Sequence, residues 1–125
     1  IHETGRPSVP GSQYRARLLQ ATNPGTVADV SDDKRLIRYV RENVLIGASP
    51  RVNLHLEPIA QVEAFFDGSD QIRPEHIKAA ARHVIPHRLK FRPEKEFRLE
   101  REFGSRAKEV VFEEILKMVE MPRWK

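Results

Sequence analysis

The sequence predicts an all-α domain, a small bundle of four to five helices. Two observations indicate this fold class. Apolar residues recur at the 3.6-residue spacing of a helix in several stretches, and proline opens two of these stretches, where it suits the first helical position. With 125 residues, of which 39% are hydrophobic and 32% are charged, the chain can bury one modest core. We therefore expect a single helical domain.

Residues 1–26 are expected to precede this domain. Residues 1–12 are rich in glycine and proline and are interpreted as a linker or a chain end. Residues 14–21 are compatible with a short helix, which the turn residues Asn23-Pro24-Gly25 would end. We assign residues 1–26 to a linker or to the tail of a preceding domain, and residues 27–125 to the helical domain.

The first strong amphipathic stretch predicts a helix from about residue 31 to residue 46. Ser31 is a suitable N-cap, and the acidic residues after it favour the positive end of the helix dipole. Gly47 is expected to end the helix as the residue after its C-cap. The predicted buried face consists of Leu36, Ile37, Val40, Val44 and Leu45.

Two further helices are expected to start at prolines. One runs from Pro50 to about Phe66, with Ser49 as its N-cap and Pro58 as an internal break in its hydrogen bonds. Its predicted core side consists of Val52, Leu56, Ile59, Ala60 and Phe66. The other runs over residues 74–85, where the apolar positions fit a helical period closely.

The last third of the chain gives a mixed pattern. Residues 87–93 are basic and alternating, and are expected to be extended or irregular. Residues 94–103 favour no single structure, although three apolar side chains could anchor them to the core, namely Phe97, Leu99 and Phe103. A final helix is expected from Ser105, its cap, to about Met121.

The composition excludes several classes of protein. No cysteine is present, which excludes disulfides and thiolate metal sites and agrees with an expected cytoplasmic location. No apolar run reaches the roughly 18 residues of a membrane span, and no secretory signal is visible. The net charge of +4 comes from 22 basic and 18 acidic residues, a mixed surface that lacks the basic stripe typical of duplex-binding domains.

The sequence contains no complete catalytic motif. It lacks the phosphate-binding loop of P-loop ATPases, the glycine-rich dinucleotide motif and the nucleophile elbow of hydrolases. His83 and His87 are four residues apart, but Pro86 interrupts them and no third ligand is evident, so no metal site is expected. We expect no catalytic residue, and no activity, in this chain alone.

The segment Gly47-Ala48-Ser49-Pro50-Arg51 is the candidate binding site. Ser49 and Pro50 favour a helix start, where free N–H groups attract anions. Arg51 faces the positive end of the helix dipole, which costs roughly 0.3–1 kcal/mol unless an anion lies nearby. A guanidinium in this place suits a phosphate or a carboxylate. The alternative is a solvated surface arginine, or one that pairs with a neighbouring acidic residue.

Three segments in the same order resemble one family. They are Gly47-Ala48-Ser49-Pro50-Arg51-Val52, then Asp67-Gly68 followed by Ile72-Arg73-Pro74-Glu75-His76-Ile77-Lys78-Ala79-Ala80, and then Val84-Ile85-Pro86-His87-Arg88-Leu89. Together they resemble the C-terminal helical lid of MoxR-type AAA+ ATPases, a group related to the ATPase subunit of magnesium chelatase. The likeness implies an AAA+ lid fold for residues 27–125, and it makes residues 1–26 a linker or the tail of the ATPase core.

The resemblance implies a role for Arg51. In that family this arginine is the sensor 2 residue, which reaches from the lid to the phosphates of ATP bound on the core. Ser49 and Gly47 are the accompanying nucleotide-binding candidates. The sequence departs from the family at Arg73, where Thr or Ser usually caps the next helix, and at Pro58, which interrupts a helix that is usually continuous.

The implied function belongs to a longer parent protein. The parent would be an ATPase that uses ATP and Mg²⁺ within a ring, a hexamer, for chaperone-like remodelling, often of partners that carry a von Willebrand factor A domain. The lid would contact its own core and neighbouring subunits. By itself, the chain is expected to bind no nucleotide and no nucleic acid, and to associate with no membrane. Two alternatives are a nucleic-acid-binding module that uses residues 87–92 with Phe91 for stacking, and an assembly module without nucleotide.

Overall fold

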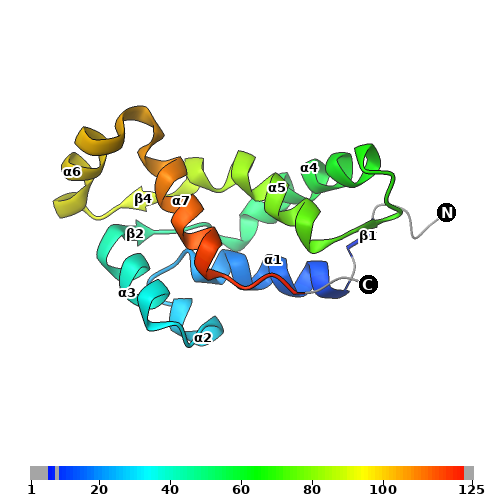
Figure 1. Ribbon diagram of the computed structural model, residues 1–125, viewed down its shortest axis with the longest axis horizontal. Helices are drawn as coiled ribbons and strands as arrows, with labels where there is room; N and C mark the ends of the chain where they lie inside the picture. Colours follow the sequence, from blue (N-terminus) through cyan, green and yellow to red (C-terminus); the bar gives the residue numbers. More distant parts are fainter. Residues whose placement is uncertain (1–5, 8, 123–125) are drawn as a thin grey trace.

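The computed structural model describes residues 6, 7 and 9–122, the first two by their backbone alone (Figure 1). The described residues form mainly helices, so the predicted all-α class is confirmed. Seven α-helices are present in this part of the chain, two more than the upper prediction. The helices are α1 (Val9–Ala21), α2 (Val27–Val30), α3 (Lys34–Asn43), α4 (Asn53–Phe66), α5 (Pro74–Val84), α6 (Pro93–Phe103) and α7 (Ala107–Met118).

Four short strands and three 3₁₀ turns connect these helices. The strands are β1 (Arg6–Pro7), β2 (Val44–Ile46), β3 (Gln71–Ile72) and β4 (Lys90–Phe91). β1 pairs with β3 in parallel, and β2 pairs with β4 in antiparallel orientation with an irregular register between Val44 and Ile46. The 3₁₀ turns are η1 (Pro50–Val52), η2 (Pro86–Arg88) and η3 (Gly104–Arg106).

One core runs through the described residues. α4 packs along α5, and α1 lies against α5, while α7 crosses towards α1 from the end that holds α6 (Figure 1). α3 contacts α7 beside the strands β2 and β4. The largest fully buried side chains come from all of these helices except α6 and include Tyr14, Leu18, Leu36, Leu56, Ile77 and Phe112.

Helix α1 is longer than expected and is part of this core. It begins at Val9, within the segment interpreted as a linker, because Pro10 is tolerated in a first helical turn. Gly11 and Tyr14 are buried, so this first half of the helix packs against the rest of the chain. The domain boundary at residue 27 stays a prediction.

The helix expected over residues 31–46 is shorter at both ends. Its N-cap is Asp33, whose carboxylate accepts the backbone N–H of Arg35 at 2.9 Å, and the helix starts at the next residue. Ser31, the predicted cap, instead accepts the N–H of Asp33 at 3.1 Å in the turn before it. The prediction named the right kind of signal and the wrong residue, because Ser31 and Asp33, both suitable caps, are only two positions apart.

The C-terminal end of the same prediction was wrong for a non-local reason. Residues 44–46 form β2, which pairs with β4. Next to this pairing, Arg92, the residue after β4, donates its N–H to the carbonyl of Asn43, the residue before β2, at 2.9 Å. Gly47 is therefore not a helix C′ residue. Positive φ occurs among the described glycines at Gly68 (72°) and Gly104 (65°), so Gly47 serves another purpose.

The two helices that were expected to start at prolines are close to their predicted bounds. α4 follows the turn η1 and continues through Pro58, and α5 begins at Pro74 as expected. Phe66 is 81% exposed, so its predicted place in the core was wrong. The buried side of α4 is narrower and consists of Leu56, Ala60 and Ala64, which follow the buried Val52 of the preceding turn.

The sequence predicts that α5 lacks a side-chain cap at its N-terminus, but a histidine forms hydrogen bonds there. His76, which is 3% exposed, accepts the backbone N–H of Arg73 through Nδ1 at 2.9 Å. Its Nε2 lies 2.9 Å from the Asp67 carboxylate, so the ring carries its proton on Nε2 and donates it there. The imidazole therefore performs the return half of a capping box and ties the start of α5 to the turn after α4.

The last two helices correct the expectations for their segments. α6 is a helix with no buried residue, and Phe97 is 75% exposed, so it does not anchor the helix as expected. Leu99 is partly buried against the core. Ser105 lies within η3 instead of capping α7, which ends at Met118, three residues before the predicted end.

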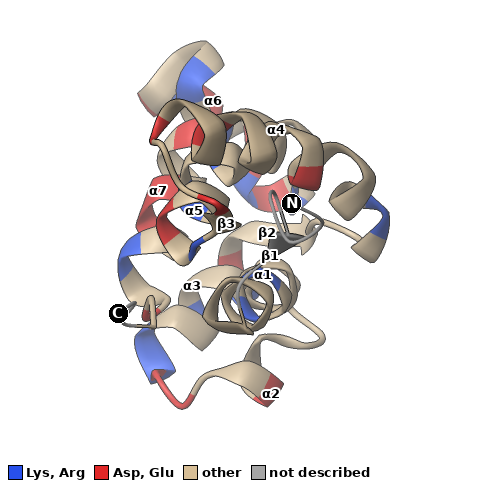
Figure 2. Cartoon of the chain, turned by 90° about the vertical axis from the view of Figure 1, so that its right-hand side faces the viewer, with Lys and Arg blue, Asp and Glu red and all other residues tan. Residues whose placement is uncertain are grey.

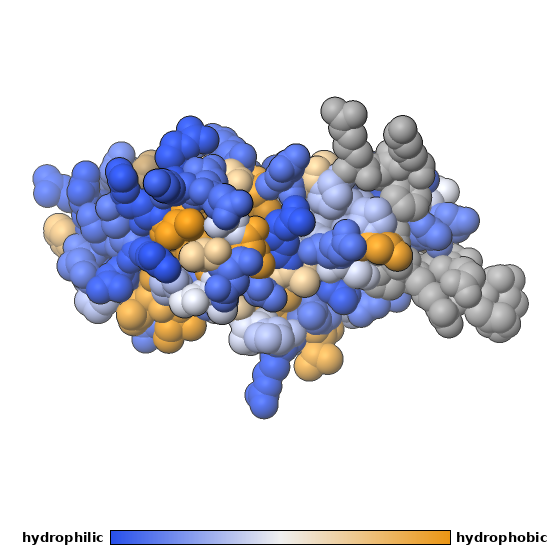
Figure 3. All heavy atoms as spheres, turned by 90° about the horizontal axis from the view of Figure 1, so that it is seen from below, coloured by the Kyte–Doolittle hydropathy of each residue, from blue (hydrophilic) through white to orange (hydrophobic). Residues whose placement is uncertain are grey.

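The surface carries charges of both signs. Figure 2 shows acidic and basic residues interspersed along the helices, as the mixed composition predicts. Seen from below, the molecule presents a largely hydrophilic face with small, separate apolar clusters (Figure 3). Across residues 6, 7 and 9–122, no helix combines the length and the apolar character needed to cross a membrane.

Candidate functional site

Arg51 lies at the middle of the turn η1, which leads directly into α4. Its side chain is exposed, and no carboxylate of the described residues lies within ion-pair distance of it. The next residue, Val52, is 2% exposed and anchors the turn in the core. The backbone at Arg51 is thus fixed while its guanidinium stays available to a group from outside the described chain.

Ser49 occupies the N-cap position that the sequence predicts. Its backbone is extended (φ −84°, ψ 165°), and its carbonyl accepts the N–H of Val52 at 3.0 Å. Its hydroxyl makes no capping hydrogen bond, so the predicted capping contact is absent although the position is right. The structure therefore brings Gly47, Ser49 and Arg51 onto one short loop between β2 and α4.

Gly47 allows this loop to lie directly against the C-terminal end of α1. A Cβ atom at this position would stand 2.2 Å from the Thr22 carbonyl oxygen and 2.7 Å from the Thr22 hydroxyl. Contacts this short do not occur for real Cβ atoms, so only glycine fits without a shift of one segment. The close approach explains this glycine, whereas the sequence suggested a helix end.

Thr22 and Asn23 hold the loop by hydrogen bonds that sequence reasoning missed. Asn23 accepts the Gly47 N–H at 2.9 Å and donates to the Ala48 carbonyl at 2.8 Å. Thr22 accepts the Ala48 N–H through Oγ1 at 3.0 Å. In the sequence, Asn23 precedes Pro24 and reads as an ordinary turn residue, and no local signal names a partner 24 positions away.

The basic segment around residues 87–92 lacks the aromatic surface that stacking on a base requires. Leu89 and Phe91 are 2% and 3% exposed, because both side chains pack into the core. His87 and Arg88 point outward from the turn η2 and are exposed. Within residues 6, 7 and 9–122, no three His, Cys, Asp or Glu side chains gather closely enough to hold a metal ion.

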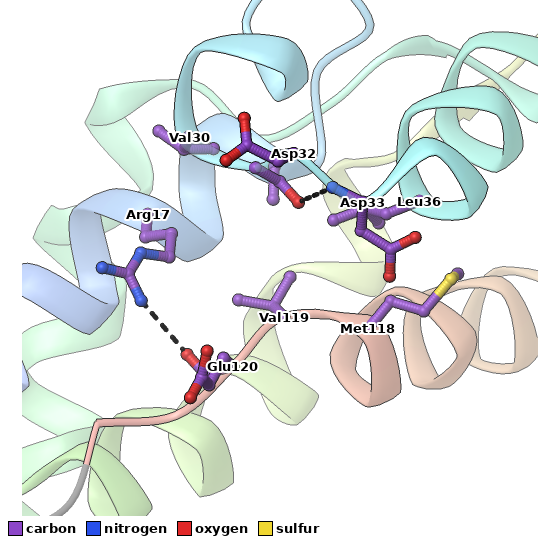
Figure 4. Close-up of a pocket in the computed structure, with 10 residues that line it drawn as sticks. Arg17, Val30, Asp32, Asp33, Leu36, Met118, Val119 and Glu120 are labelled. Carbon is purple, nitrogen blue, oxygen red and sulfur yellow. Dashed lines mark hydrogen bonds between the residues drawn. The ribbon is translucent and has the colours of Figure 1, made fainter.

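A separate hollow of about 430 Å³ lies between the C-terminal ends of α1 and α7 and the segment before α3 (Figure 4). Arg17 lines one side of it and donates to the Glu120 carbonyl at 3.4 Å, and the Asp33 carboxylate lines the other side. The backbone N–H of Arg35 is the main cause that lowers the pKa of Asp33. None of the loop residues 47–51 lines this hollow, so it is not part of the candidate site.

Comparisons with known proteins identify what the chain is similar to. A sequence model of the AAA lid domain matches residues 38–115, from within α3 to within α7. The uncharacterized protein YeaC of Bacillus subtilis (strain 168) is 32% identical over 110 residues, which cover 84% of this chain and 32% of YeaC. The crystal structure of a candidate ATPase from Cytophaga hutchinsonii ATCC 33406 superposes with a TM-score of 0.72 at 24% identity, over 94% of this chain and 32% of that one.

The likeness to the Cytophaga hutchinsonii protein supports the fold alone, because the two sequences are only 24% identical. The chain spans about a third of the length of both proteins. Thr22 and Asn23 lie outside the residues that the lid model matches, although they hold the loop that carries Arg51.

Proposed function

Because this chain belongs to the AAA lid domain family, we propose that it is the lid of a MoxR-type AAA+ ATPase and that Arg51 is its sensor 2 residue. In this proposal Arg51 reaches the phosphates of an ATP–Mg²⁺ complex that a core domain of the same protein binds. The lid closes over the nucleotide, and hydrolysis changes the angle between lid and core. The resulting movement serves chaperone-like remodelling by a ring, a hexamer, whose partners carry a von Willebrand factor A domain.

The observation that carries the proposal is the environment of Arg51. An exposed arginine without an acidic partner in the described chain stands on a turn whose next residue, Val52, is buried. A planar guanidinium can bridge two phosphate oxygens, and such charge-assisted bonds contribute about 1.5–3 kcal/mol each. A fixed backbone lowers the entropy lost when the side chain engages a phosphate.

The accompanying candidates have different support. The Ser49 hydroxyl is not engaged in a cap, so it can turn towards a bound anion beside Arg51. Gly47 already donates its N–H to Asn23, and its support is steric, because it lets the loop approach α1. That Gly47 and Ser49 contact nucleotide stays a prediction.

An apolar stripe on α4 supports docking of the lid onto the rest of the longer protein. Leu54, Val62, Phe65 and Phe66 are 75%, 51%, 76% and 81% exposed, and their spacing places them along one side of the helix with Pro58 between them. Apolar groups gathered in this way mark contact surfaces. We infer that the core domain or a neighbouring subunit covers the stripe. ATP use and the absence of cysteine make the cytoplasm the proposed location.

The ATPase rate of the longer protein tests the sensor 2 assignment. Arg51→Ala should reduce kcat about ten- to a hundredfold, the equivalent of one lost charge-assisted bond. Arg38→Ala removes an exposed arginine from the middle of α3 and is the matched control, which should leave the rate unchanged. Equal rates for the Arg51→Ala variant and the natural protein would refute the assignment.

A further inference from the structure

The end of α1 is bonded to the loop that carries Arg51, and we propose that Thr22 and Asn23 are positioning residues for this arginine. The proposal rests on the sensor 2 function proposed above and extends it to residues outside the matched lid region. In this view the side chains of Thr22 and Asn23 set the place from which Arg51 reaches the nucleotide.

Asn23 bonds to the loop through both polar atoms of its side-chain amide. Its Oδ1 accepts the Gly47 N–H at 2.9 Å, and its Nδ2 donates to the Ala48 carbonyl at 2.8 Å. The same Nδ2 lies 3.2 Å from the Leu19 carbonyl, which joins the amide to the last turn of α1. One acceptor and one donor on a single planar group thus engage backbone groups of two consecutive residues, which fixes both the distance and the orientation of the loop.

Thr22 completes this contact from inside the core. Its side chain is fully buried, and its hydroxyl has one proton, which it donates to the Leu19 carbonyl at 2.8 Å. The oxygen therefore uses a lone pair to accept the Ala48 N–H at 3.0 Å. Gly47 lies against the Thr22 carbonyl so closely that no side chain fits between them. The hydrogen bond and the close approach, together with the two bonds from Asn23, leave the loop little freedom to slide along α1.

Only two residues separate this contact from Arg51. Pro50 has a restricted φ, and Val52 is buried on the other side of Arg51. The backbone of Arg51 is therefore held from both directions, by the bonds to α1 before it and by the core after it. Because small displacements of a binding group can change rates many-fold, loosening the first of these holds should weaken the contact of Arg51 with nucleotide.

A double-mutant cycle in the longer protein tests the proposal. Asn23→Ala should lower kcat about two- to tenfold, as expected for a lost positioning hydrogen bond, and should lower it no further when Arg51 is already alanine. Thr22→Val, which keeps the shape and removes the hydroxyl, should behave in the same way. Thr22→Ser keeps the hydroxyl and should retain the natural kcat.

The matched control is Asn43→Ala. Asn43 is partly buried at the end of α3 and donates to the Tyr39 carbonyl four residues earlier at 2.8 Å, as Asn23 does to Leu19. We expect both variants to lose thermal stability, Asn23→Ala the more, because the Asn23 side chain makes three hydrogen bonds and that of Asn43 makes one. Only Asn23→Ala should lose kcat.

The possible outcomes separate this proposal from the sensor 2 assignment. If Arg51→Ala lowers kcat and Asn23→Ala does not, or if the two losses multiply in the double variant, the positioning role is refuted and the sensor 2 role stands. A kcat for Thr22→Ser as low as that of Thr22→Val also refutes it. If Arg51→Ala leaves kcat unchanged, both proposals are refuted.

Discussion

Replacing Gly47 by alanine should destabilise the domain through a single clash. The added Cβ would lie 2.2 Å from the Thr22 carbonyl oxygen, well inside the 3.0 Å below which one of the two groups must move. That oxygen belongs to the backbone at the end of α1, so it cannot rotate away as a side-chain end would. The loop and α1 must therefore separate by about 1 Å.

The cost of this separation follows from the bonds that it stretches. The Gly47 and Ala48 N–H groups and the Ala48 carbonyl bond to Thr22 and Asn23 at 2.8–3.0 Å. Each such bond contributes about 1 kcal/mol to stability. In the opposite direction, alanine reduces the conformational entropy of the unfolded chain relative to glycine, which stabilises the folded state by about 0.4–1 kcal/mol. We expect the free energy of unfolding to fall by about 2–3 kcal/mol.

Urea unfolding of the purified 125-residue chain, followed by far-ultraviolet circular dichroism, measures this loss. Gly25→Ala is the control, because nothing lies within 4 Å of a Cβ built there and its φ is not positive. That variant should unfold within about 1 kcal/mol of the natural chain. Similar midpoints for Gly47→Ala and Gly25→Ala would refute the argument from close approach.

Three further predictions concern the core, an ion pair and the exposed stripe. Burial raises the pKa of Tyr14 from its ordinary value of 10.0 to about 12. Because the phenol then ionises first in the unfolded chain, the free energy of unfolding should fall as pH rises from 10 towards 12, and the Tyr14→Phe variant should show a smaller fall in alkaline unfolding. Arg82 bonds Glu113 through two contacts of 2.8 Å and 3.2 Å, but both side chains are almost half exposed, so a double-mutant cycle should give only about 0.2–1 kcal/mol, and less at high salt. Replacing Phe65 and Phe66 by serine should leave urea unfolding of the isolated chain nearly unchanged. In the longer protein it should lower the thermal stability if the core domain covers the stripe, or weaken ring assembly in sedimentation if a neighbouring subunit does, and no change in either property would contradict the docking role.

Local signals explain why some elements could be predicted closely. α5 is defined by Pro74 at its first position and by a regular apolar stripe, and both act within the helix itself. Non-local partners explain the largest error. Val44, Leu45 and Ile46 continue a helical period in sequence, yet they pair with β4, almost fifty residues later. Nothing near residue 44 encodes that pairing, and a short apolar run is compatible with a helix or a strand.

The candidate site shows the same division. The position of Arg51 at a helix start follows from Ser49 and Pro50, which are its neighbours in the chain. The bonds from Thr22 and Asn23 could not be predicted, because a threonine and an asparagine before Pro24 are typical of any turn. His76 was missed for a different reason, since capping boxes normally carry Glu or Gln at that position.

Whether nucleotide covers Arg51 in the longer protein tests the central claim most directly. Phenylglyoxal modifies accessible guanidinium groups, and mass spectrometry can report the extent at Arg51 and at the exposed Arg38 separately. The sensor 2 role predicts that a non-hydrolysable ATP analogue with Mg²⁺ protects Arg51 and leaves Arg38 as reactive as before. Equal modification of Arg51 with and without the analogue would contradict it.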